Sequence, residues 1–301
     1  MPCFSPLKGF YSAEVNPSGK RSITFDRNRS HSGVSLAIPC GQCIGCRLEK
    51  SRQWAMRCLH EKRLSRESCF ITLTYDNRHL PLGGTLVKRD LQLFMKRLRK
   101  LKGNGIRFFA CGEYGDLNLR PHYHVLLFHC DFYDKVRISQ NRRGDIYYCS
   151  DTLSSIWTVG HSVIGEVTFD SAAYVARYVV KKITGEKAAS HYCVQDGDGV
   201  VYERLPEFTL MSRRPGLGAG WYDKYGKETY VHDSVIINAR EVRPPRFYDS
   251  RLAQSDNPLL DIIKRKRRKK AWLLRKDNTP DRRRVKEVLA LKRLKMLERC
   301  V

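Results

Sequence analysis

The sequence is poor in acidic residues and has no long apolar run. Asp and Glu number 31 among 301 residues, against 56 Lys and Arg, which gives a formal net charge of +25 at pH 7. Such an excess of positive charge predicts a polyanionic partner. No apolar stretch approaches the ~20 residues that span a bilayer, so we expect no membrane partner. The Gly-x-x-x-x-Gly-Lys-[Ser/Thr] phosphate loop is also absent, so no ATP-driven step is expected.

The first residues contain no apolar signal core, which favours a cytoplasmic setting. Eleven cysteines are an odd number, which suits reduced thiols better than a disulfide scaffold. Cys40, Cys43 and Cys46 follow one another at two-residue gaps, and this spacing lets neighbouring sulfurs converge on one ion. Cys3 is the expected fourth ligand and Cys58 the alternative. We favour structural zinc, while an iron–sulfur cluster and unligated thiols stay open.

Hydrophobic periodicity predicts strands that alternate with helices. Helices are expected over residues 47–66, 88–102 and 171–183, and strands over residues 69–75, 106–111, 122–129 and 161–167. Asp170 is expected to cap the helix that follows it. Residues 112–116 with Pro121 form a tight turn between the second and third strands, which requires antiparallel pairing. The prediction is an α+β fold, an antiparallel sheet covered by helices on one side.

Composition divides the chain into four expected parts. These are a Cys-rich N-terminal region and helix (1–66), a catalytic domain (67–185), a less regular extension (186–250) and a basic helical tail (251–301) interrupted near residues 278–280. From Lys264 to Val301 there are 17 Lys and Arg against 4 Asp and Glu. This run predicts binding to a phosphate backbone, with a solvated helix face as the alternative.

Two arginines in the extension are further candidates for DNA contact. Arg213 and Arg214 precede a glycine-rich turn, where guanidinium groups and approachable backbone can bind phosphate. An ordinary basic turn is the alternative.

Two histidines and one glutamate have the pattern of a divalent-metal site. His122 and His124 are two apart on a predicted strand, so both side chains project from the same face, while Tyr123 points into a core on the other. Histidine pairs without a metal role are equally common, so a third ligand is needed. Glu113, at the end of the neighbouring strand, is the expected one. A solvated turn residue is the alternative for Glu113.

Tyrosines and lysines form a ridge on the helix predicted for residues 171–183. Tyr174, Tyr178 and Lys182 are four apart, and Lys181 lies close to the direction of Tyr174. Tyrosines that face a core would explain this ridge too. Beside a metal site in a cationic chain, however, they favour tyrosine attack on a phosphodiester. A metal polarises the phosphate and a lysine stabilises the developing charge.

Three segments, in this order, resemble the three motifs of HUH-type rolling-circle replication initiators. They are residues 70–75 (FITLTY), 120–128 (RPHYHVLLF) and 174–182 (YVARYVVKK). The paired tyrosines and the RPHYH run look most like the initiators of gokushovirus-like Microviridae, small single-stranded DNA phages, and the resemblance extends over at least residues 1–250. It implies a five-stranded antiparallel sheet with the histidines on a central strand. It also implies Mg²⁺ or Mn²⁺, a 5′-phosphotyrosine product and a free 3′-hydroxyl that primes synthesis.

The leading hypothesis is therefore a replication initiator that nicks an origin and rejoins the ends to circularise a genome. Its expected partners are single-stranded and origin DNA and a host replication helicase or polymerase. A plasmid relaxase or transposase of the same chemistry is an alternative, although relaxases usually carry a third histidine beside a pair such as His122 and His124. A non-catalytic, zinc-stabilised nucleic-acid-binding protein is the alternative from another class. It leaves the tyrosine–lysine ridge unexplained.

Overall fold

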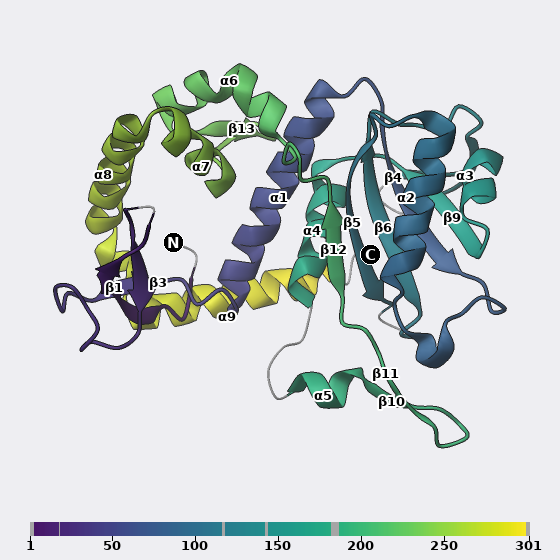
Figure 1. The fold of residues 1–301 in the computed structure, drawn as a ribbon, viewed down its shortest axis with the longest axis horizontal. Helices are drawn as coiled ribbons and strands as arrows, with labels where there is room; N and C mark the ends of the chain where they lie inside the picture. The colour runs from purple at the N-terminus through teal and green to yellow at the C-terminus, as the bar shows by residue number, and fades with distance from the viewer. Residues whose placement is uncertain (1–2, 18, 116–117, 142–143, 182–186, 299–301) are drawn as a thin grey trace. The chain divides into compact units, whose positions relative to one another are not determined.

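The computed structural model describes most of the chain and divides it into two compact units (Figure 1). It describes residues 3–17, 19–115, 118–141, 144–181 and 187–298, and of residues 178–181, 187 and 295–298 it describes the backbone only. The smaller unit contains Met1–Lys50 and Lys264–Val301, and the larger one contains Ser51–Ile263. Among these described residues, no helix combines the length and apolar character needed to cross a membrane.

The larger unit is built on a seven-stranded sheet with the order β12-β5-β6-β4-β9-β8-β7, and every pair in it is antiparallel. Its strands are β4 (Ser68–Tyr75), β5 (Arg107–Tyr114), β6 (Pro121–Phe128), β7 (Val136–Gln140), β8 (Ile146–Cys149), β9 (Gly160–Gly165) and β12 (Phe208–Met211). The predicted antiparallel α+β class is confirmed. The sheet has seven strands, not the five that the resemblance implied, because β12 and β7 extend its two edges.

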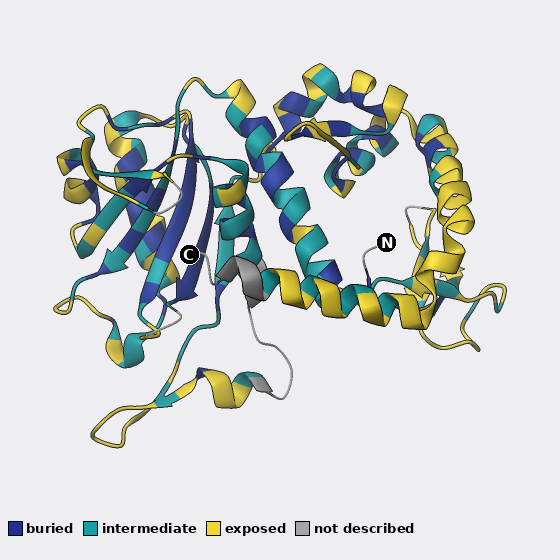
Figure 2. Cartoon of the chain, turned by 180° about the vertical axis from the view of Figure 1, so that it is seen from behind, coloured by how far each residue is buried: buried dark blue, intermediate teal, exposed yellow. Residues whose placement is uncertain are grey.

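Helices cover both faces of the sheet, so the expectation of helices on one side was wrong. They are α1 (Ile44–Leu64), α2 (Lys88–Lys102), α3 (Asp151–Ile156) and α4 (Phe169–Lys181), and a short 3-10 turn, η1 (Leu82–Gly84), precedes α2. Figure 1 shows α2 and α4 against opposite faces of the central strands. The physical reason is that β5 and β6 are buried along nearly their whole length, on both faces (Figure 2).

Two separate apolar clusters result. One contains Leu91, Phe94 and Leu98 of α2 together with Tyr123 and Val125 of β6, which are fully buried, so the predicted inward direction of Tyr123 is confirmed. The second cluster lies on the opposite face and includes Ala55 and Cys58 of α1, Phe109 of β5, Leu126 and Phe128 of β6, and Ala172, Val175 and Ala176 of α4. The sheet is therefore the middle layer of three.

The N-terminus of α4 is capped by Thr168 and not by Asp170. The Thr168 hydroxyl accepts a hydrogen bond from the Ser171 backbone N–H at 3.0 Å, and the Ser171 hydroxyl accepts one from the Thr168 N–H at 2.8 Å. This reciprocal pair is a capping box, with serine where glutamate is usual. Asp170 lies in the first turn instead. The cap fixes where the helix that carries Tyr174 begins.

The part after residue 186 is more regular than predicted. It contains α5 (Lys187–Tyr192), β10 (Cys193–Gln195), β11 (Val201–Glu203), β12, α6 (Ala219–His232), β13 (Val235–Ile237), β14 (Arg240–Val242) and α7 (Arg246–Ser255). A third apolar cluster includes Trp221, Tyr230 and Tyr248 from this part. The buried His60 ring of α1 stacks on Trp221, 3.6 Å between ring centroids, and its Nδ1 lies 2.7 Å from the Tyr248 hydroxyl.

The smaller unit combines a small sheet with basic helices. Strands β1 (Leu7–Val15), β2 (Arg21–Thr24) and β3 (Leu36–Ile38) form an antiparallel sheet in the order β2-β1-β3. The last elements are α8 (Asn257–Leu273), the 3-10 turn η2 (Arg275–Asn278) and α9 (Pro280–Glu298). The predicted helical tail with an interruption near residues 278–280 is confirmed. Pro280 is the first residue of α9, where its missing N–H costs no hydrogen bond.

The α2 helix provides a matched pair of leucines for a stability test. Leu98 is fully buried, whereas Leu101, one turn later, is 59% exposed. We expect Leu98→Ala to lower the free energy of unfolding by about 2–5 kcal/mol, because it leaves a cavity against the sheet. Leu101→Ala should change it by less than about 0.5 kcal/mol. Urea unfolding measures both, and equal losses would contradict the packing described here.

Candidate functional site

Five side chains share one face of the sheet near the ends of three adjacent strands. On β5 and β6, Glu113 lies opposite His122, and on β4 and β6, Thr74 lies opposite His122 and Thr72 opposite His124. Cross-strand partners project from the same face of a sheet. The pairing of the strands, which no single motif determines, therefore brings the predicted histidines and glutamate together.

The two imidazoles converge on a single carboxylate oxygen. His122 Nε2 lies 2.8 Å and His124 Nε2 lies 2.7 Å from Oε1 of Glu113. Glu113 is only 2% exposed and belongs to the strand, so it is not the solvated turn residue of the alternative interpretation. Its second oxygen, Oε2, is buried and has no hydrogen-bond partner in the described part of the chain.

The outer nitrogens of the two rings are also held. His122 Nδ1 lies 3.0 Å from the carbonyl oxygen of Arg120, and His124 Nδ1 lies 2.9 Å from the Thr72 hydroxyl. A carbonyl only accepts, so His122 donates from Nδ1 to Arg120 and turns its Nε2 towards the carboxylate. At 2.8 Å, Nε2 and Oε1 are joined either by a proton on Nε2 or by a cation bound to both atoms. The donor set fits a divalent cation.

Glu113 is ionised at neutral pH despite its burial. Burial acts to raise its pKa, but hydrogen bonds from His122 and His124 and their positive charge outweigh it, so the pKa lies below the ordinary carboxyl value. A buried carboxylate with one orphaned oxygen attracts a cation strongly. The three ligand atoms lie within 4.8 Å of one another.

Tyr174 lies beside this group of ligands. Its ring meets the His124 ring edge-on, with 5.2 Å between centroids and 78° between planes. It is half-buried, and α4 packs its Val175 and Ala176 against the sheet. The Arg177 guanidinium carbon is 5.9 Å from the Tyr174 ring centroid. The structure thus brings the first predicted nucleophile to the predicted metal ligands.

The other residues of the predicted ridge are described less fully. Tyr178 and Lys181 belong to α4, where their backbone is described, but their side chains lie outside the described part, and Lys182 lies outside the described residues altogether. An α-helix rises 1.5 Å per residue, so the Tyr178 backbone is about 6 Å further along α4 than that of Tyr174.

Arg213 and Arg214 lie far from the Glu113 site. Both are exposed and follow β12, which ends beside the start of β5. At that end the Arg107 side chain donates a hydrogen bond to the Pro215 carbonyl at 2.9 Å. Glu113 is six residues further along β5, roughly 20 Å away at ~3.3 Å per residue. The two arginines therefore do not join the histidine–glutamate group.

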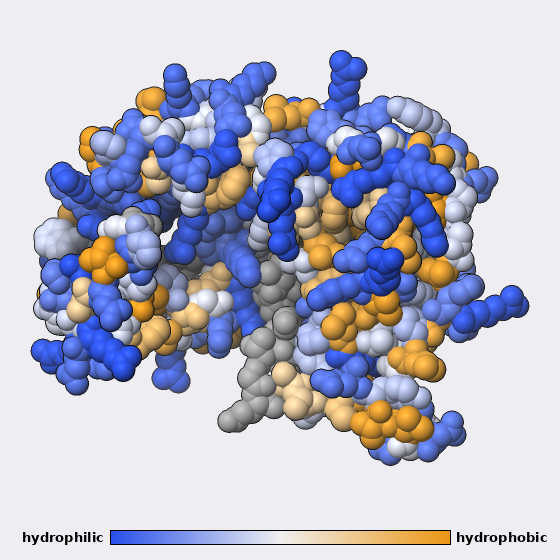
Figure 3. Space-filling view, in the orientation of Figure 1, coloured by the Kyte–Doolittle hydropathy of each residue, from blue (hydrophilic) through white to orange (hydrophobic). Residues whose placement is uncertain are grey.

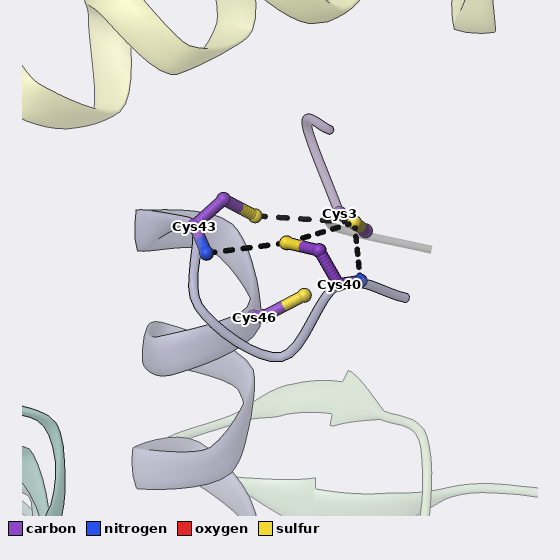
Figure 4. A group of neighbouring side chains, drawn as sticks. All are labelled: Cys3, Cys40, Cys43 and Cys46. Atoms are coloured by element: carbon purple, nitrogen blue, oxygen red, sulfur yellow. Dashed lines mark hydrogen bonds between the residues drawn. The ribbon is translucent and has the colours of Figure 1, made fainter. Parts of the chain in front are cut away.

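Four cysteines of the smaller unit form a second group of candidate metal ligands (Figure 4). The Cys3 sulfur lies 3.7 Å from that of Cys40 and 3.9 Å from that of Cys43, and all four sulfurs, with Cys46, lie within 4.8 Å of one another. Tetrahedral zinc with Zn–S bonds of about 2.3 Å separates its sulfurs by about 3.8 Å. Cys58, the alternative fourth ligand, is buried elsewhere in the core under the sheet.

Backbone donors favour a thiolate within this cysteine group. The Phe4 N–H donates to Cys43 Sγ at 3.3 Å. Burial acts to raise the pKa of Cys43, but this bond, a bond from the Cys46 backbone and contacts with the Cys40 and Cys46 thiols lower it to about 6. Burial and the neighbouring Cys3 and Cys43 groups raise the pKa of Cys46 to about 12. The Cys43 sulfur is thus favoured in its thiolate form, and a bound cation would favour deprotonation of the neighbouring thiols as well.

Sequence reasoning missed Thr72, Arg120 and Arg177. The first two orient the imidazoles, and the third lies beside Tyr174. A signal for Thr72 was present, because Thr72 and Thr74 alternate along β4 just as His122 and His124 alternate along β6. The role of Arg120 comes from its backbone, which no residue type reveals.

The lowered pKa of Glu113 predicts a pH-dependent contribution to stability. In buffer free of divalent cations, its ionised form adds stability that is present above the ordinary carboxyl pKa and is lost as pH falls through the lowered value. The difference in unfolding free energy between wild type and Glu113→Gln should therefore shrink from pH 7 towards pH 3. Urea denaturation measures it, with Glu203→Gln on the exposed β11 as the control. A difference that stays constant would contradict the ionised, hydrogen-bonded carboxylate.

Residues 68–183 match the family model described as "Replication-associated protein ORF2/G2P". The matched range runs from β4 to the end of α4, so it contains every residue of the histidine–glutamate–tyrosine site. No solved structure matches the chain significantly.

Curated relatives extend the likeness beyond this range. The chain is 33% identical over 257 residues to the replication-associated protein VP4 of Bdellovibrio phage phiMH2K, and the alignment covers 82% of this chain and 76% of VP4. It is also 33% identical over 262 residues to the replication-associated protein ORF2 of Spiroplasma virus 4, and that alignment covers 82% of this chain and 78% of ORF2. A third relative, ORF4 of Chlamydia phage 1, is 34% identical over 237 residues, with 75% and 56% covered. The chain belongs to the Microviridae-like family of phage replication-associated proteins.

Proposed function

We propose that this chain initiates rolling-circle replication by nicking single-stranded origin DNA through a tyrosine and later rejoining the ends. One observation carries the proposal: the Tyr174 ring lies against His124, whose Nε2 shares the Glu113 oxygen with His122. Tyr174 packs against the apolar cluster under α4 and also borders a buried cluster of metal-ligand type, which an ordinary core tyrosine does not. The family's name, replication-associated protein, supports the same role.

His122, His124 and Glu113 are the proposed ligands of Mg²⁺ or Mn²⁺. Two nitrogens and a carboxylate oxygen are fewer ligands than such an ion takes, so an ion held there could also bind a phosphate oxygen, polarise the phosphate and stabilise its developing charge. The Arg120 carbonyl and the Thr72 hydroxyl hold the rings in the orientation in which both Nε2 atoms point to the same spot.

Tyr174 is the proposed nucleophile. Its phenolic oxygen forms a bond to the phosphorus of the scissile phosphodiester, and the bond from phosphorus to the 3′ oxygen breaks. The phenolic proton is released, and the departing 3′ oxygen takes up a proton to become a 3′-hydroxyl. The 5′ end stays joined to the protein, and the ester keeps the energy of the broken bond, so rejoining needs no ATP. The free 3′-hydroxyl is the group that a host polymerase extends.

Tyr178, Lys181 and Lys182 complete the proposed machinery. A second tyrosine one helical turn away permits a second transfer while the first ester still holds a DNA end. Lys181 and Lys182 are the proposed cations that stabilise the phenolate or the phosphate charge. Arg177 is a further candidate for this task, since its guanidinium is described beside Tyr174.

Arg213 and Arg214 have a different proposed role. At roughly 20 Å from Glu113 they are too distant to act on the scissile phosphate, but they are exposed at one end of the sheet. They are proposed to contact phosphates several nucleotides away from the nick. A host helicase is a further proposed partner.

Cys3, Cys40, Cys43 and Cys46 are the proposed ligands of a structural zinc ion. Sulfur separations of 3.7 and 3.9 Å fit thiolates that bind one ion. In a four-iron cluster each cysteine binds a different iron, and in a two-iron cluster the cysteines bind in two pairs, so in neither would all four sulfurs gather around one ion. Zinc would tie the first residues of the chain to the start of α1.

The nucleophile assignment predicts a covalent adduct. Protein is incubated with Mn²⁺ and single-stranded oligonucleotides that tile the encoding replicon, labelled on the 3′ side of the nick, and is then run on a denaturing gel. Wild type should retain label, the Tyr174→Phe/Tyr178→Phe variant should retain none, and each single variant should keep part of the activity. Tyr133→Phe, which alters an exposed tyrosine, is the control.

Two results of that experiment would overturn the proposal. An adduct that persists in the double variant would refute the assignment of Tyr174 and Tyr178 as the nucleophiles. The absence of an adduct with every oligonucleotide would refute the nicking activity and favour a non-catalytic binding protein.

The zinc assignment predicts about one zinc per purified chain, measured by elemental analysis. Cys40→Ser should lose most of that zinc, whereas Cys149→Ser, which lies outside the cluster, should keep it. Circular dichroism checks that both variants retain the fold of the larger unit. Coloured protein that contains iron, or zinc unaffected by Cys40→Ser, would contradict the assignment.

A further inference from the structure

The smaller unit carries most of the excess positive charge. Its two segments, Met1–Lys50 and Lys264–Val301, contain 24 Lys and Arg against 7 Asp and Glu, a net charge of +17 out of the +25 of the whole chain. Hydrophilic side chains cover much of its visible surface in Figure 3, and α9 is largely exposed in Figure 2. None of the residues in the proposed nicking site belongs to this unit, so its charge calls for a separate explanation.

A groove of about 490 Å³ lies within this unit, between the Cys3 segment and one stripe of α9. Its cations are Arg282, Arg283, Lys286 and Arg293, and its apolar lining includes Phe4 and Leu289. The α9 members recur at three- and four-residue steps, so they share one face of the helix. The groove is lined by no Asp or Glu within the described residues.

The cations of the groove are only partly neutralised from outside it. Asp277 accepts hydrogen bonds from Arg282 at 3.0 Å and from Lys286 at 2.5 Å. Arg283, in contrast, has a buried Nε without a hydrogen-bond partner among the residues that the structure describes. A buried, unpaired guanidinium nitrogen costs free energy that an anionic ligand would recover. The groove therefore has unused capacity to bind a phosphate.

The opposite wall of the groove is attached to the cysteine group. The Phe4 N–H donates to Cys43 Sγ, and the Cys40 N–H donates to Cys3 Sγ, both at 3.3 Å. Because these bonds hold the backbone of the Cys3 segment, the cluster fixes where the Phe4 ring lies along the groove. An aromatic ring beside a row of cations is the combination that binds single-stranded nucleic acid, through stacked bases and neutralised phosphates.

We infer that this groove is a second DNA site, which binds the sugar-phosphate backbone of a single strand between α9 and the cysteine-anchored Phe4. A duplex is a poorer fit, because its base faces are stacked inside the helix and cannot reach the Phe4 ring. The choice of DNA as the ligand rests on the proposed function. The groove contains none of the nicking residues, so the groove itself would bind a strand without cutting it.

The test measures binding in the absence of Mg²⁺ and Mn²⁺. Zinc-loaded full-length protein is titrated against a fluorescent oligothymidylate at several monovalent salt concentrations, with anisotropy as the readout. Each phosphate contact contributes about 0.7 to the slope of log K against log salt for a single strand. Arg283→Ala/Arg293→Ala should lower the slope by about 1.4 and weaken binding about 25-fold at 0.1 M salt.

A matched variant controls for the loss of charge. Arg284→Ala/Lys292→Ala removes two cations from α9 residues that do not line the groove. It should weaken binding less than about threefold, since only long-range attraction is lost at this ionic strength. Equal losses in the two double variants would overturn the inference and leave α9 as a solvated basic face.

Phe4→Leu separates stacking from charge. It should weaken binding to the single strand by about fivefold or more, as expected for the loss of one stacked base, and leave the salt slope unchanged. Its zinc content should equal that of wild type, because the Phe4 contact with Cys43 uses the backbone. An unchanged affinity, or a duplex that binds as tightly as the single strand, would overturn the inference. Normal adduct formation alongside such a result would leave the proposed nicking function intact.

Discussion

The rest of the site depends on the contact between one carboxylate oxygen of Glu113 and the Nε2 atoms of His122 and His124. That contact exists because β5 and β6 pair with Glu113 opposite His122. A slip of one residue would turn every side chain of a strand to the other face of the sheet. The alternation of Tyr123 and Val125 into the opposite core opposes such a slip, since it would take these side chains out of that core and put the histidines into it. Core packing and ligand geometry therefore enforce the same register.

Burial on both faces explains why the site lies under a helix. The side of the sheet that carries the histidines also carries Phe109 and Leu126, which α4 covers with Val175 and Ala176. The reciprocal cap at Thr168 sets the start of α4, and packing sets its rotation, so Tyr174 meets His124 at the edge of that core. A half-buried tyrosine next to a buried polar cluster thus follows from ordinary helix-on-sheet packing.

The sequence predicted local features well and global ones less well. The bounds of α2 and the same-face projection of His122 and His124 followed from periodicity. The position of Glu113 beside His122 followed from the hairpin between their two strands. The prediction that helices cover only one face of the sheet was wrong, because β5 and β6 are buried on both faces. Three strands of the sheet, β7, β8 and β12, were not predicted, and β12 joins the sheet from nearly a hundred residues beyond β5. Long-range pairing of that kind leaves no local pattern in a single sequence.

The central claim is that Tyr174 and Tyr178 form the bond to DNA, and peptide mapping of the adduct tests it most directly. Trypsin cleaves after Arg177, so the two tyrosines separate into different peptides of the digest. After nuclease digestion of the adduct, tandem mass spectrometry should find the nucleotide mass on Tyr174, on Tyr178, or on a mixture of both. A nucleotide on any other residue would contradict the account of the site.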